Sequence, residues 1–77
     1  MYYGRVYTQA FIRQLRDRYP EGVRVELESL YDPSRAKLKP GDRGTVKAVN
    51  SYGVIYVNWD CGISLGLIYE DDVFRII

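Results

Sequence analysis

Few residues of this chain could take part in catalysis. It contains no histidine, and Cys61 is its only cysteine. Serine and cysteine nucleophiles therefore lack the imidazole base that usually activates them, and acid–base work would fall to carboxylates, Tyr or Lys. One thiolate without histidine also cannot form an ordinary zinc site. We therefore expect a protein that is not an enzyme and that holds no metal or cofactor.

Four carboxylates gather in the C-terminal part of the chain: Asp60, Glu70, Asp71 and Asp72. Carboxylate oxygens are ligands that hard divalent cations prefer, so a cation site is one interpretation. Acidic residues are also typical of turns, where they accept hydrogen bonds from backbone N–H groups. The simpler interpretation, and the one we adopt, is two turns with a solvated rim.

The segment "PGDRG", residues 40–44, raises the question of a phosphate-binding loop. Such a loop follows a strand and opens a helix whose N-terminal amides face the anion. Here the β-branched run "TVKAV" follows, which predicts a strand. We interpret the segment as a turn, with Gly44 permitting a close approach of two backbones.

Spacing of apolar residues predicts one helix over residues 8–19, with Thr8 as its N-cap. Its apolar face consists of Phe11, Ile12, Leu15 and Tyr19. Pro20 and Gly22 should end the helix, because proline cannot continue its hydrogen-bond ladder.

Alternation and turn residues predict five short strands after the helix: residues 23–30, 45–49, 54–59, 64–69 and 73–77. Regular short strands favour a small antiparallel barrel, which removes the exposed edges of an open sheet. We therefore predict one mainly β domain, residues 1–77, with an N-terminal arm (1–7), a helix (8–19) and a barrel (23–77).

Charge is distributed unevenly although the formal net charge is only +1. Residues 1–19 carry +3, and residues 57–77 carry −3. A generally basic surface for nucleic acid is therefore not expected. No apolar stretch is long enough to span a membrane or resembles a secretory signal, so we expect a cytoplasmic protein.

Eight tyrosines exceed what a chain of 77 residues can bury, so some should be exposed and available for contacts. In the strand over 54–59, alternation places Trp59 in the core and leaves Tyr56, Asn58 and Asp60 outside. The predicted partner-binding surface is Tyr31, Asp32, Tyr52, Tyr56, Asn58 and Asp60.

Arginines near the N-terminus offer a second hypothesis, a nucleic-acid-binding surface formed by Arg5, Arg13, Arg16 and Arg18. On a helical wheel these side chains spread around the helix and do not form a stripe, and Asp17 partly neutralises Arg13.

The chain resembles the bacterial and phage family catalogued as domain of unknown function 4314. The resemblance covers about 70 residues, from "RYPEGVRVELESLYDP" through "LKPGDRGTV" to the C-terminus. The residues that carry it are Gly22, Arg24, Val25, Leu27, Asp32, Pro33, Pro40, Gly41, Gly44, Thr45, Val46, Val57, Trp59, Asp60, Gly62, Ser64 and Leu65. Cys61 and Ile63 depart from the pattern, where the family usually has Asn and a small or polar residue.

The resemblance implies an SH3-like barrel, a scaffold that hosts protein binding, nucleic-acid binding and, in some toxins, ribonuclease activity. Near-neutral charge and surplus tyrosines favour a non-catalytic protein-interaction module, an accessory protein of a phage or mobile element. Nucleic-acid binding through the arginines is the alternative, and a toxin-like ribonuclease is the third hypothesis.

Overall fold

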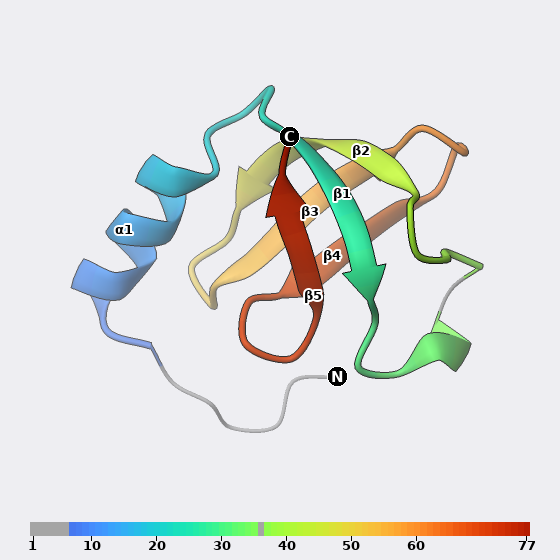
Figure 1. Cartoon of the computed structure of the whole chain (residues 1–77). Helices are drawn as coiled ribbons and strands as arrows, with labels where there is room; N and C mark the ends of the chain where they lie inside the picture. Colours follow the sequence, from blue (N-terminus) through green and yellow to red (C-terminus); the bar gives the residue numbers. More distant parts are fainter. Residues whose placement is uncertain (1–6, 36) are drawn as a thin grey trace.

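The computed structural model describes residues 7–35 and 37–77 (Figure 1). Its elements are α1 (Gln9–Arg18), β1 (Arg24–Ser29), the 3-10 turn η1 (Pro33–Arg35), β2 (Arg43–Val49), β3 (Val54–Trp59), β4 (Ser64–Ile68) and β5 (Val73–Ile76). The predicted N-terminal arm, residues 1–7, lies outside the described residues except for Tyr7.

Helix α1 begins and ends where the sequence predicts. The hydroxyl of Thr8 accepts a hydrogen bond from the Phe11 N–H at 3.1 Å, as an N-cap does. At the other end Tyr19 caps the helix, and Gly22 adopts a φ of 96°, which turns the chain toward β1. The buried side of the helix, formed by Ile12 and Leu15, faces the sheet.

The strands form one antiparallel sheet in the order β4-β3-β2-β1-β5. The first four follow one another as a meander, and β5 then crosses back to pair with the outer side of β1. Figure 1 shows the sheet bent strongly, with α1 beside the end that carries the β2–β3 hairpin. The mainly β, antiparallel fold with one N-terminal helix is therefore confirmed.

The predicted closed barrel is not confirmed, because the described edge strands β4 and β5 are not paired with each other. At the end of β4 the Ile68 N–H donates to the Asp72 carboxylate at 2.8 Å, so a side chain satisfies this backbone donor. The sheet is bent but open between these two strands.

The core lies between the concave face of the sheet and α1. Alternation in β3 buries Ile55, Val57 and Trp59, as the sequence predicts. The Trp59 indole N–H donates to the Leu65 carbonyl at 3.2 Å, which satisfies its one polar group. The buried cluster consists of Ile12, Leu15, Tyr19, Val25, Leu27, Leu30, Leu38, Val46, Val49, Ile55, Val57, Trp59 and Leu67.

The "PGDRG" segment is a turn that leads into β2, as predicted. Gly41 takes a positive φ of 93° at the turn, and Gly44 lies in the strand directly against β3. A Cβ atom on Gly44 would lie 2.9 Å from the backbone oxygen of Asn58. Only glycine fits at this approach of two strands.

Candidate functional site

Part of the predicted partner surface lies on the outer face of β3. Tyr56 and Asn58 alternate with buried residues and point outward, and Tyr56 is 44% exposed. Both nevertheless have partners within the fold. Asn58 accepts from the Ser64 hydroxyl at 3.0 Å, and Tyr56 accepts from the Asn50 side chain at 3.4 Å. The Tyr56 ring also covers Gly66 of β4, where an added Cβ would lie 3.4 Å from the ring.

Asp60 is exposed, as the alternation predicts, and it forms an ion pair with Arg24. Both of its oxygens accept from the Arg24 guanidinium, at 2.7 and 2.6 Å, in the two-pronged geometry that strengthens such pairs. The hydrogen bonds from Arg24, and its positive charge, hold the pKa of Asp60 below its ordinary value. Arg24 donates in addition to the Thr45 hydroxyl at 3.0 Å.

A second set of ion pairs lies on the same face of the sheet. Glu26 of β1 accepts from Arg43 of β2 and from Arg75 of β5, each at 3.0 Å, and these bonds lower its pKa. Opposite charges on neighbouring strands stabilise the sheet as cross-strand pairs. The outer face is thus largely occupied by contacts between its own side chains.

Tyr52 and Tyr31 lie at opposite ends of the sheet. Tyr52, 73% exposed, occupies the β2–β3 hairpin, whereas Tyr31, 75% exposed, follows β1 at the other end of the strands. Asp32 accepts from the backbone N–H and the hydroxyl of Ser34 and so forms a local turn. The structure therefore divides the predicted surface and does not bring its members into one patch.

The arginines of the nucleic-acid hypothesis are also dispersed. Arg13 is exposed on α1, whereas Arg16 donates through Nε to the Val49 carbonyl at 3.1 Å. Arg18 donates to the Tyr69 hydroxyl at 3.1 Å. Arg5 lies outside the described residues. Two of the three described arginines therefore use part of their hydrogen-bonding capacity within the fold.

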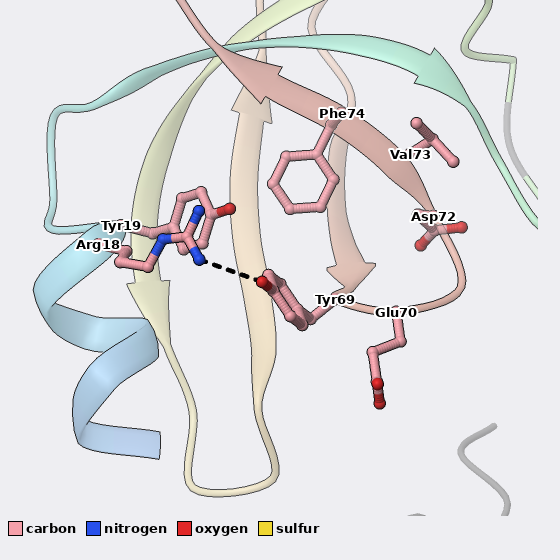
Figure 2. A pocket seen from close by; sticks show the side chains of 7 residues that line it. All are labelled: Arg18, Tyr19, Tyr69, Glu70, Asp72, Val73 and Phe74. Carbon is pink, nitrogen blue, oxygen red and sulfur yellow. Dashed lines mark hydrogen bonds between the residues drawn. The ribbon is translucent and has the colours of Figure 1, made fainter. Parts of the chain in front are cut away.

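The structure reveals a site that sequence reasoning missed, an open pocket of about 490 Å³ between the end of α1 and β5 (Figure 2). It is lined by Arg18, Tyr19, Tyr69, Glu70, Asp72, Val73 and Phe74, and we call it the aromatic pocket. The ring of Tyr19 lies 5.5 Å from that of Phe74 and 6.3 Å from that of Tyr69, between centroids. The aromatic pocket is thus built from two segments that are far apart in the sequence.

A guanidinium already rests on these rings. The Arg18 group lies 5.6 Å from the centroid of Tyr19 and 6.0 Å from that of Tyr69, within the range of a cation–π interaction. Figure 2 shows Arg18 at one wall of the aromatic pocket and Glu70 at the other. The walls therefore differ in charge, and aromatic rings lie between them.

Tyr19 presents a polar atom to this pocket that the described protein leaves without a partner. The residue is only 6% exposed, and no hydrogen bond joins its hydroxyl to any residue among 7–35 and 37–77. Its hydroxyl points into the pocket (Figure 2). Burial raises the pKa of Tyr19, while Arg18 lowers it and Tyr69 raises it. Buried polar groups nearly always have a partner, so a water molecule or a ligand group should bind here.

Asp72 fixes the loop that forms one wall. It is a buried carboxylate, 3% exposed, and accepts from the backbone N–H groups of Tyr31 at 2.9 Å and Ile68 at 2.8 Å. The neighbouring Glu70 accepts from the Tyr7 hydroxyl at 3.2 Å. These hydrogen bonds connect the β4–β5 loop to the segment after β1, to the end of β4 and to Tyr7, which precedes α1.

Among the described residues, no group of three or more His, Cys, Asp or Glu side chains could hold a metal ion. Cys61 is exposed at the β3–β4 turn. No helix in the part of the chain that the structure describes is long and apolar enough to cross a membrane.

Fold and pocket together define a small antiparallel β domain with an N-terminal helix and an aromatic recess between them. The chain belongs to the family described as "Domain of unknown function (DUF4314)", whose model matches residues 8–77. The match extends from the N-cap of α1 to the last residue and includes every residue of the aromatic pocket. No curated protein matches the chain.

Proposed function

We propose that this protein is a non-catalytic protein-interaction module that binds an extended segment of a partner protein in the aromatic pocket. The observation that carries the proposal is the Tyr19 hydroxyl, which points into the pocket from a residue only 6% exposed and has no partner among the described residues. Recognition sites commonly combine an apolar, aromatic lining with a few placed polar groups.

An extended peptide matches this lining in two respects. Its side chains supply apolar surface for the rings of Tyr69 and Phe74, and its backbone carbonyls can accept from the Tyr19 hydroxyl. Because the aromatic side chains are fixed by their contacts with one another, little conformational entropy is lost when the peptide binds.

The bent sheet and its strand order support an SH3-like barrel, open between β4 and β5, as the scaffold. On this proposal the unpaired edges of β4 and β5 lie next to the aromatic pocket, since the β4–β5 loop joins these edges and lines the pocket. The accessory role in a phage or mobile element is part of the same proposal and rests on the sequence resemblance alone.

Selection of peptides from a displayed random library against the full chain tests the proposal. Enriched peptides should bind the purified protein, and Tyr19→Phe, which removes only the hydroxyl, should weaken them about fivefold, the value of one hydrogen bond. Phe74→Leu should weaken them further, because it replaces a ring by an aliphatic side chain.

Two outcomes would contradict the proposal. One is a selection that yields no peptide. The other is a set of peptides that tolerate Tyr19→Phe and Phe74→Leu but lose binding when Tyr52 or Tyr56 is replaced by serine, which would place recognition on the outer face of the sheet.

A further inference from the structure

Strand β5 leaves one of its edges open. It is an outermost strand of the sheet, so only the side that faces β1 is paired. Just after β5, the Ile77 N–H donates to the Arg24 carbonyl at 3.0 Å, so this end of the chain directs its backbone groups toward β1. Successive residues of an antiparallel strand direct these groups to opposite sides. Those of Arg75 therefore also face β1, and those of Phe74 and Ile76 face the open edge.

The hydrogen bonds on the other side of β1 agree with this alternation. Phe74 lies opposite Leu27. The Leu27 N–H donates to the Asp42 carbonyl and its own carbonyl accepts from the Gly41 N–H, both at 2.8 Å, so these groups face away from β5. No hydrogen bond joins the edge-facing N–H and carbonyl groups of Phe74 and Ile76 to the rest of the described chain. They are left for the backbone of another chain.

The edge of β4, by contrast, is closed at its end by the β4–β5 loop. The Ile68 N–H donates to the Asp72 carboxylate, and the Ile68 carbonyl accepts from the N–H groups of Asp71 and Asp72 at 3.1 and 2.9 Å. Sheets usually protect an open edge with proline, an inward-pointing charge or a covering loop. Residues 74–76 contain no proline, and their one charged side chain, Arg75, is paired within the sheet. The β5 edge thus lacks these forms of protection.

Apolar side chains lie beside the open edge. Phe74 and Ile76 lie opposite Leu27 and Val25, both fully buried, and so share the inner face of the sheet with them. Ile76 is 48% exposed, and Phe74 lines the aromatic pocket between β5 and the end of α1 (Figure 2). A strand paired with this edge would direct every second side chain to the same face. One such side chain would enter the aromatic pocket beside Phe74, and the next would cover Ile76.

We infer that the partner segment binds as an added antiparallel strand, with its backbone hydrogen-bonded to Phe74 and Ile76 and an apolar side chain in the aromatic pocket. Backbone hydrogen bonds to an open edge supply affinity in this mode of recognition, and pockets for alternate side chains supply specificity. The partner segment therefore carries apolar residues at every second position. The inference rests on the proposed function and specifies the backbone geometry and the side chains of its partner.

A defined peptide tests the inference with the full-length protein. The probe is acetyl-Gly-Lys-Val-Thr-Ile-Thr-Val-Lys-Gly amide, in which apolar residues alternate with threonine and the lysines provide solubility. In one variant the isoleucine nitrogen carries a methyl group, which removes an N–H that would point at β5. In the matched control the nitrogen of the following threonine is methylated instead, and that N–H would point away from β5. Binding is followed by NMR at millimolar peptide.

The unmodified probe should bind about tenfold more tightly than the peptide methylated at isoleucine and about as tightly as the threonine control, because only the former loses a hydrogen bond to the edge. Bound probe should slow hydrogen exchange of the Phe74 and Ile76 amides about fivefold and leave that of Arg75, which already faces β1, unchanged. Ile76→Pro removes an edge N–H and should weaken the probe about tenfold, whereas Ile76→Val should not. The two methylated peptides decide the question even if Ile76→Pro impairs folding.

Equal binding of the two methylated peptides would overturn the inference, as would no binding of the unmodified probe. A free protein that is dimeric in solution, with its Phe74 and Ile76 amides already protected, would also overturn it, because a second copy would then occupy the edge. If library peptides still bind and depend on Tyr19 in any of these cases, the proposed function stands and only the strand pairing is refuted. If neither the probe nor any library peptide binds, the proposed function itself fails.

Discussion

Asp72 should be the most sensitive polar position in the described structure. Its side chain is buried, and its two oxygens accept the backbone N–H groups of Tyr31 and Ile68. Asp72→Ala would leave both donors without a partner in partly buried surroundings. Each unsatisfied group costs about 1–3 kcal/mol, so we expect a loss of about 2–5 kcal/mol in the free energy of unfolding. This is a large share of the roughly 4–12 kcal/mol expected for a domain of this size.

Urea denaturation followed by Trp59 fluorescence measures the loss, since Trp59 is buried in the core and is the only tryptophan. Asp72→Asn should have an intermediate effect, because its amide keeps one acceptor oxygen and turns an NH₂ group toward the other donor. The control Asp17→Ala, at an exposed carboxylate on α1, should change stability by less than about 0.5 kcal/mol. An Asp72→Ala protein as stable as this control would refute the assigned role.

Three further predictions concern the rest of the fold. Leu15→Ala should cost about 2–4 kcal/mol, because Leu15 is almost fully buried beneath α1; an unchanged urea midpoint would show that the helix does not pack on the sheet. Gly44→Ala should destabilise by about 2 kcal/mol or more, since its Cβ would collide with the backbone of β3; full stability in thermal unfolding would contradict that packing. Ion pairing lowers the pKa of Glu26 and of Asp60 in the folded state. The stability that these ion pairs contribute should therefore be complete above the ordinary carboxyl pKa range and should decline as the pH falls below about 4. Glu26→Gln should make this decline shallower when the free energy of unfolding is measured against pH. An unchanged pH profile would argue against the ion pairs of Glu26.

Local patterns predicted most of the fold because each element has its own signal. Thr8 and the apolar spacing behind it identify α1, and the alternation around Trp59 identifies β3 and its buried face. Gly44 could be assigned a close backbone approach because a glycine inside a strand pattern has few other reasons to be there. Closure of the sheet was not predictable in this way, because it depends on whether the β4–β5 loop brings the two edge strands close enough to pair.

The candidate site was harder to predict, because it is formed by residues from opposite ends of the chain. Tyr19 ends the apolar face of the helix and was expected to be a core residue; its ring is in the core, whereas its hydroxyl has no partner among residues 7–35 and 37–77. Asp60 is exposed as expected, but its partner Arg24 is distant in sequence and could not be identified from spacing. The one local signal was "YEDDVF", in which aromatic residues flank three carboxylates. Sequence analysis interpreted its three carboxylates as a turn between two strands, and the structure adds that residues of this segment line the aromatic pocket.

Mapping a bound peptide by NMR would show whether a partner segment binds in the aromatic pocket. The isotope-labelled full chain would be titrated with the tightest peptide from the library selection. If the segment binds there, the amide and side-chain signals of Arg18, Tyr19 and residues 69–74 should change together and saturate, while those of Tyr52 and Tyr56 remain unchanged. Saturating changes confined to the outer face of β3, with the pocket signals unmoved, would contradict binding in the pocket.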